Sequence, residues 1–157
     1  MPIPDTILNY LDQNEVEYQV IKHQHSSRSY ESSQLAHVDA NKVAKAILLK
    51  SKDDYVLAVL PANLSIDMNG LREEYGSQIE MAQEHELGSI FPDCELGAIP
   101  AIGEVYGLDT IIDTKLLSLP EVYFEAGDHK RLIQVSEPDF EKMLPSAHYN
   151  YISKDWE

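Results

Sequence analysis

The chain has 157 residues, 43% of them hydrophobic, which suits one domain over residues 1–157 with a single core. Its formal net charge of −15 argues against a protein that holds DNA or RNA by neutralising many phosphates, so any nucleic acid contact is expected to be local. The sequence has no signal-peptide layout and no apolar run near the roughly 18 residues of a membrane span, so we expect a cytoplasmic protein without membrane contact. Its single cysteine, Cys94, leads us to expect neither an internal disulfide nor a cysteine-based zinc site.

The first half of the chain predicts two helices, one strand and a β-hairpin. In chain order these are a helix over residues 5–14, a strand over 17–23, a short helix over 29–39, and a hairpin whose strands, 43–50 and 55–61, flank the turn sequence SKDD. In the first helix Ile7, Leu8 and Leu11 share one face, and Asp5 is expected to be its N-cap.

The second half predicts a more irregular succession of elements. In chain order these are a helix over 66–76, a strand over 78–82, a helix over 83–91, an apolar loop over 91–107, a strand over 109–117, a strand pair over 121–127 and 131–136, and a helix over 137–144. Asp67 is expected to cap the first of these helices and Gly76 to end it. Because helices alternate irregularly with single strands and hairpins, we predict an α/β protein of the α+β type, in which helices wrap a mixed, curved sheet of about six or seven strands.

Lys45 interrupts the apolar run of the predicted strand 43–50. Val43 and Ile47 share its face of that strand, so the ammonium either reaches an edge of the sheet or ends in a pocket. An edge-strand lysine that discourages aggregation is the simpler interpretation. A pocket lysine would need a partner such as a phosphate or a carbonyl oxygen. Periodicity leaves both open.

Two turns are candidates for the rest of such a pocket. The loop GAIPAIG, residues 97–103, has glycines six apart with a proline between them, and its backbone N–H groups can receive an anionic or carbonyl oxygen. A buried structural turn is the alternative. In EAGDH, Gly127 and Asp128 are typical of a hairpin turn, and His129 either faces solvent or lines a site.

No metal, cofactor or standard hydrolase motif is indicated. His23 and His25 lie on the same side of an extended segment, but their spacing supplies no third metal ligand. Cys94 and the distant His129 form a conceivable nucleophile and base, although a single cysteine is more often a small apolar residue. We therefore expect neither a metal nor a cofactor.

Five segments follow one another between about Ser26 and Leu144: VAKAILLK, YVLAVLPA, SIFPDCELGAIPAIG, TIIDTKLL and VYFEAGDHKRLIQVS. Together they resemble the YbaK/prolyl-tRNA-synthetase-associated family. The resemblance implies a YbaK-like mixed sheet wrapped by helices and a free-standing, trans-editing aminoacyl-tRNA deacylase. Such an enzyme hydrolyses the ester of a mischarged tRNA at the 3′ acceptor end, and an aminoacyl-tRNA synthetase is a second candidate partner.

The resemblance also implies which residues form the site. The family's functional lysine falls on Lys45, where it would hold a phosphate or carbonyl oxygen near the terminal adenosine. The residues expected to bind substrate are Gly97, Ala98, Ile99, Pro100, Ala101, Gly103, Gly127, Asp128 and His129. Because the sequence offers no obvious general base, loop N–H groups are expected to polarise the ester while water or a ribose hydroxyl attacks.

One departure from the family pattern keeps an alternative function open. The family's Gly-x-x-x-Pro loop falls on residues 97–101, but here the last position is Ala101 and the proline, Pro100, comes one residue earlier. The alternative is a non-catalytic binding or regulatory module that uses the same pocket for an aminoacyl- or nucleotide-like ligand.

Overall fold

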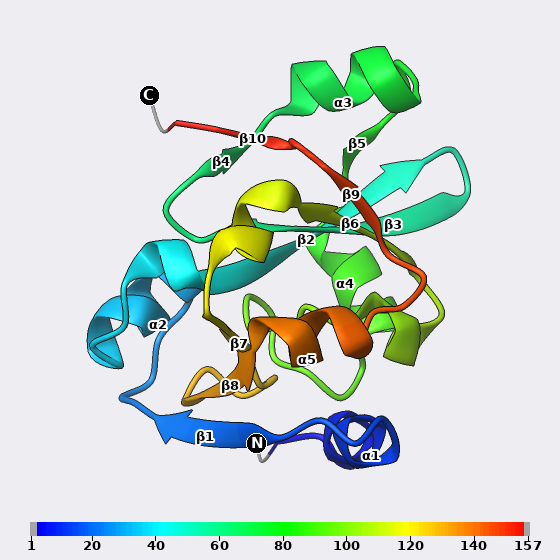
Figure 1. Cartoon of the computed structure of the whole chain (residues 1–157). Coiled ribbons are helices and arrows are strands. Elements are labelled where there is room, and N and C mark those ends of the chain that lie inside the picture. The colour runs from blue at the N-terminus through cyan, green and yellow to red at the C-terminus, as the bar shows by residue number, and fades with distance from the viewer. Residues whose placement is uncertain (1–2, 156–157) are drawn as a thin grey trace.

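The computed structural model describes residues 3–155 and shows a mixed sheet with helices around it (Figure 1). The elements in chain order are α1 (Asp5–Gln13), β1 (Tyr18–Lys22), α2 (Ser29–Leu35), η1 (Ala40–Lys42), β2 (Val43–Ser51), β3 (Asp54–Pro61), β4 (Ser65–Ile66), α3 (Met68–Tyr75), β5 (Glu80–Met81), α4 (Glu84–Ile90), η2 (Gly103–Tyr106), β6 (Asp109–Asp113), η3 (Thr114–Ser118), β7 (Glu121–Glu125), β8 (Arg131–Ser136), α5 (Glu137–Lys142), β9 (His148–Asn150) and β10 (Ser153–Lys154). None of the helices within residues 3–155 is long and apolar enough to cross a membrane.

The main sheet is mixed and has β2 and β3 near its centre. Its strand order is β1-β8-β7-β2-β3-β6-β9, and β5 pairs with β2 off this path. β2 runs antiparallel to β3 and to β5 but parallel to β7. The separate pair β10 and β4 joins the C-terminal segment to the connection after β3. The predicted fold class, a mixed sheet of about seven strands wrapped by helices, is confirmed.

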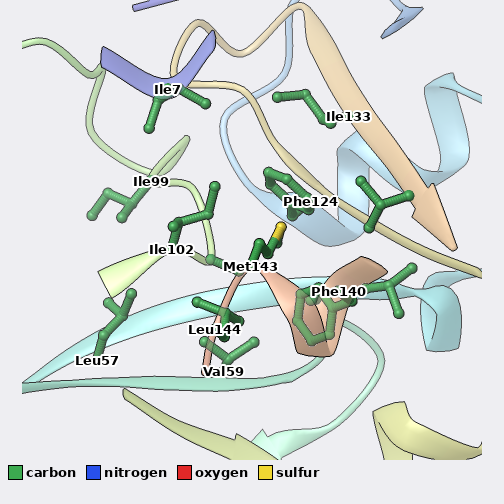
Figure 2. Packing of buried hydrophobic residues seen from close by; sticks show 14 of the residues in the cluster. Ile7, Leu57, Val59, Ile99, Ile102, Phe124, Ile133, Phe140, Met143 and Leu144 are labelled. Atoms are coloured by element: carbon green, nitrogen blue, oxygen red, sulfur yellow. The ribbon is translucent and has the colours of Figure 1, made fainter. Parts of the chain in front are cut away.

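The main hydrophobic core lies on one face of the sheet. Ala44 and Leu48 of β2 contribute to it together with residues of α1 and α5. Figure 2 shows Phe124, Phe140 and Met143 gathered in this core, and all three side chains are fully buried. Two smaller apolar clusters lie against the opposite face of β2, one beside α2 and one beneath α3. In Figure 1, α3 and α1 lie at opposite ends of the molecule.

Local sequence signals predicted most helices and strands correctly, but one predicted helix cap and one predicted strand end were wrong. Asp67 caps α3 by accepting a hydrogen bond from the Gly70 N–H (3.1 Å), as expected. Asp5, however, lies inside α1, whose N-cap residue is Pro4. The strand predicted over 109–117 ends at Asp113, because this carboxylate accepts a hydrogen bond from the Lys115 N–H (2.9 Å) and so starts η3.

Candidate functional site

Lys45 lies on β2 at a fork in the sheet. Within residues 3–155, the register of β7 with β2 covers Val43 and Ala44 alone. The register of β5 with β2 begins at Leu49. Between these two registers β2 is paired on one side, by β3. In the sheet order β2 lies between β7 and β3, so Lys45 is on an inner strand, at a point where one side of that strand is open.

The lysine occupies a gap between two apolar clusters on one face of β2. Val43 belongs to the cluster beside α2, and Ile47 packs against the cluster beneath α3. Lys45 lies between them on the same face, opposite Leu60 of β3, and is half-buried. The side chain therefore interrupts the apolar run at the point where the two clusters separate.

The surroundings of Lys45 favour contact with an oxygen. Its Nζ donates a hydrogen bond to the carbonyl oxygen of Leu64, between β3 and β4. Burial and, to a smaller extent, the charge of Arg28 lower the pKa of Lys45 from its ordinary value. An anion beside Nζ would offset both effects and stabilise the protonated ammonium.

A cavity of about 220 Å³ lies at the fork and is lined by β2, the start of α2 and the loop after α4. Its lining residues are Arg28, Ser29, Tyr30, Lys45, Ala46, Ala62 and Gly97. The structure thus brings together two residues that the sequence analysis placed in one site, Lys45 and Gly97. They are separated by about fifty positions of sequence and meet because the loop reaches β2 where β7 has departed.

Gly97 can approach so closely because it has no side chain. Its φ of +85° lies in the left-handed region, and a Cβ there would be 2.5 Å from the carbonyl oxygen of Ser27 and 3.0 Å from Cε1 of His129. His129 in turn donates from Nε2 to the carbonyl oxygen of Leu96. The loop is therefore held between the segment before α2 and the β7–β8 turn.

Most of the remaining loop residues face the core. Ala98, Ile99, Pro100 and Ala101 are buried, and Ile99 and Ala101 belong to the main core cluster. A Cβ on Gly103 would be 2.3 Å from Oγ1 of Thr110, so this glycine packs against β6. Of the residues predicted in the GAIPAIG loop, Gly97 alone lines the cavity with Lys45.

The three predicted residues of the β7–β8 turn have different surroundings. The buried carboxylate of Asp128 accepts hydrogen bonds from the N–H groups of Lys130 (3.0 Å) and Arg131 (3.1 Å) and pairs with the Arg131 guanidinium (2.6 Å). Gly127 has a φ of +96°, and its carbonyl oxygen accepts a hydrogen bond from the Glu95 N–H (2.9 Å). Asp128 and Gly127 thus build the turn and brace the loop, while His129 touches the loop beside Gly97.

His129 presents one unused nitrogen. Nε2 donates to the Leu96 carbonyl oxygen, whereas Nδ1 is buried with no hydrogen-bond partner in the described part of the chain. The ring of His25 lies 5.4 Å away between centroids. Within residues 3–155 no group of three His, Cys, Asp or Glu side chains is arranged to hold a metal ion.

Cys94 is not an activated nucleophile. Burial raises the pKa of its thiol to about 12, and its Sγ lies 3.3 Å from the hydroxyl of Tyr106. The thiolate is the reactive form of cysteine, and a thiol with this pKa is protonated near neutral pH. The structure therefore does not favour the nucleophile and base pair of Cys94 and His129.

The sequence analysis missed two features of the structure. The start of α2 supplies Arg28, Ser29 and Tyr30 to the lining, and the concentration of cations in residues 22–52 is the signal that could have drawn attention to Arg28. The second is Glu125 at the end of β7, which is fully buried. Burial raises the pKa of Glu125 to about 7, the Ser32 hydroxyl opposes this rise, and the Asp128 charge adds to it.

Comparisons with known sequences agree with the region that forms the cavity. The sequence profile of the aminoacyl-tRNA editing domain matches residues 23–143, which include Lys45, Gly97 and His129. No curated protein sequence matches the chain.

Several solved structures share the fold. A scaffold protein used for computational epitope grafting has a TM-score of 0.84 and 14% identity, with 99% of each chain covered. A candidate trans-editing enzyme for prolyl-tRNA synthetase has a TM-score of 0.82 and 17% identity, with 98% of each chain covered. A candidate signal-transduction protein from Marinobacter aquaeolei has a TM-score of 0.79 and 18% identity, and the match covers 98% of this chain and 31% of that one. At these identities the likenesses establish the fold alone.

Proposed function

Because the chain belongs to the aminoacyl-tRNA editing domain family, we propose that it is a trans-editing deacylase that hydrolyses the ester of a mischarged aminoacyl-tRNA. The substrate enters by its 3′ acceptor end, and an aminoacyl-tRNA synthetase is a second candidate partner. The observation that carries this proposal is the cavity of about 220 Å³ that Lys45 and Gly97 share.

A small second site of this kind answers a known limit of synthetases. One methylene group contributes only about 1–3 kcal/mol to discrimination, so a synthetase cannot reject a slightly smaller amino acid by binding alone. A separate hydrolytic cavity removes the wrong product afterwards. A volume of about 220 Å³ suits a small aminoacyl group better than a large one.

Lys45 is suited to hold an oxygen of the substrate. An ammonium has three donors, and one of those of Lys45 is directed at the Leu64 carbonyl oxygen. Its position beneath the start of α2 leaves it half-buried, where its interaction with a charged oxygen is stronger than in water. We assign it the ester carbonyl or a neighbouring phosphate oxygen.

Backbone N–H groups of the loop can polarise the ester. The Ala98 N–H donates to the carbonyl oxygen of Glu95 (3.1 Å), whereas the N–H groups of Gly97 and Ile99 make no hydrogen bond within the described residues. Donors on a fixed loop stabilise an oxyanion as it develops, at little reorganisation cost. Water or the adjacent ribose hydroxyl then completes the attack, and this scheme requires no ionised cysteine.

A non-catalytic module is the second candidate. The observation that favours it is Ala101, which stands where the family pattern has proline, in a loop whose side chains mostly face the core. In that case the cavity would bind an aminoacyl- or nucleotide-like ligand without turnover.

Amino acid release from a panel of Ala-, Ser-, Thr- and Cys-tRNA distinguishes these functions. We expect the wild type to release at least one amino acid and Lys45→Ala to lose this activity. Lys52→Ala, in the exposed β2–β3 turn, is the matched control and should remain active. Thermal denaturation of both variants checks folding, since loss of the Lys45 hydrogen bond should cost only about 1 kcal/mol. A folded, fully active Lys45→Ala would overturn the assignment, and no release from any substrate would favour the binding module.

A further inference from the structure

The positive charge of this protein is concentrated in one segment, residues 22–52. This segment holds six of the twelve Lys and Arg residues but only two of the 27 Asp and Glu residues, so its formal charge is +4 and that of the remaining chain is −19. The segment contains α2 and β2, which together supply most of the cavity lining. The cationic part of the sequence and the cavity therefore coincide.

Several of the cations in and near this segment are already paired. Lys42 lies 3.4 Å from a carboxylate oxygen of Glu121, and Lys50 lies 2.7 Å from one of Glu86. Because each already lies beside a carboxylate, both lysines are weaker candidates for binding an external phosphate. Arg131 is likewise paired with Asp128, within the β7–β8 turn.

Arg28 differs from these residues because it forms none of the ion pairs found within residues 3–155. It is exposed and is the N-cap residue of α2, with an extended backbone. Glu31, the nearest acidic residue in sequence, accepts a hydrogen bond from the Ser27 N–H (3.1 Å). The guanidinium of Arg28 thus keeps its donors for solvent or for a ligand.

Arg28 and Lys45 line the same cavity although they carry like charges. The proximity is electrostatically significant, since the charge of Arg28 contributes to the lowered pKa of Lys45. Two cations at one small cavity repel each other unless an anion lies between or beside them. An anion that enters this cavity would therefore lie close to two positive charges, in a chain whose net charge is −15.

We propose that Arg28 binds a backbone phosphodiester of the single-stranded 3′ end of tRNA at the rim of the cavity, beside Lys45. This inference rests on the proposed function and extends it. A guanidinium presents a planar fork that matches two phosphate oxygens, whereas the Lys45 ammonium is a point charge. Because Arg28 is exposed and Lys45 is half-buried, the phosphate meets Arg28 outside and the ester carbonyl meets Lys45 inside.

The test compares Arg28→Gln and Arg28→Lys with the control Lys52→Gln. Lys52 is seven residues beyond Lys45 along β2 and its turn, which places it roughly 23 Å away at about 3.3 Å per residue. For deacylation we expect Arg28→Gln to raise KM about tenfold with kcat within about twofold, and to reduce the log–log salt slope by about one unit. Arg28→Lys should fall between wild type and Arg28→Gln, and Lys52→Gln should match wild type.

A binding measurement without turnover separates this inference from the proposed function. The probe is the trinucleotide CCA, titrated by calorimetry or NMR, with inorganic phosphate at equal ionic strength as the second arm. We expect Arg28→Gln to weaken CCA binding about tenfold and Lys52→Gln to leave it unchanged.

Unchanged CCA binding and KM in Arg28→Gln would overturn the inference, even if Lys45→Ala abolished turnover and so upheld the proposed function. Equally tight binding of inorganic phosphate through Arg28 would also overturn it, because the site would then be one for a free anion. Arg28-dependent CCA binding in a wild type that deacylates nothing would instead refute the deacylase and leave the phosphodiester contact standing.

Discussion

Replacing Glu125 by glutamine should stabilise this protein at alkaline pH and have little effect at acid pH. Glu125 is fully buried at the end of β7, and neither of its carboxylate oxygens meets the geometry of a hydrogen bond within the described residues. Burial is the largest cause that raises its pKa from 4.5 to about 7. The folded protein therefore holds this side chain as a neutral acid under conditions in which the unfolded chain has already lost the proton.

The sign and size of the effect follow from proton linkage. A folded pKa above the unfolded one means that the contribution of Glu125 to stability is fully present below about pH 4.5 and is lost as pH rises through about 7. The full loss is about 3 kcal/mol, since one pKa unit corresponds to about 1.4 kcal/mol. Glutamine is close in shape and never ionises, so Glu125→Gln should remove this loss.

Urea denaturation of wild type and Glu125→Gln at pH 5, 6, 7 and 8 measures this difference directly. We expect the free energies of unfolding to be similar at pH 5 and to diverge by about 1–3 kcal/mol in favour of glutamine at pH 8. Glu73→Gln, on the exposed face of α3, removes the same charge from the surface and serves as the control. If the difference between Glu125→Gln and wild type is the same at pH 5 and pH 8, the carboxyl group is not held neutral by burial and the reasoning fails.

Two other substitutions test how the loop and the C-terminal segment are held. Gly97→Ala should lower the free energy of unfolding by about 1–3 kcal/mol, because its Cβ would overlap the Ser27 carbonyl in a left-handed conformation. Gly88→Ala is the control, since a Cβ there meets nothing within 4 Å, and equal melting temperatures for the two variants would contradict the contact. Asp113→Asn should lower the free energy of unfolding by about 1–3 kcal/mol. The two oxygens of this buried carboxylate accept hydrogen bonds from the N–H groups of Lys115 and Ile152, whereas the asparagine amide has only one acceptor oxygen. Hydrogen exchange should report loss of protection at Ile152 first, and unchanged protection there would exclude this role.

The features that the sequence predicted well depend on local chemistry. The hairpin of β2 and β3, the caps of α3 and the turn between β7 and β8 each carry their signal within a few residues. The short strands β4, β9 and β10 were missed, since two or three residues contain no recognisable period.

The candidate site was predicted less completely because its geometry is tertiary. Periodicity cannot tell an edge lysine from one placed between two apolar clusters, and Lys45 is the latter. Arg28 and Gly97 meet across the cavity only because β7 leaves β2 after Ala44. The burial of Glu125 likewise depends on α2 lying over the end of β7, since Ser32 of α2 is the hydroxyl that its carboxyl group meets.

The fork at β2 explains how an acidic protein can carry a cationic site without a basic surface. Because β2 exchanges β7 for β5 within a few residues, a short stretch of an inner strand is open, and Lys45 and Arg28 are placed at that opening. Outside residues 22–52 the formal charge is −19. Exposed charges more than about 8–10 Å apart are largely screened at cellular ionic strength, so a single strand that enters the cavity is attracted by the two cations nearby. The helical body of a tRNA that came closer would instead meet the acidic surface. On the function proposed, the negative charge thus favours substrates whose 3′ end extends freely from the duplex, and it contributes to selectivity instead of opposing binding.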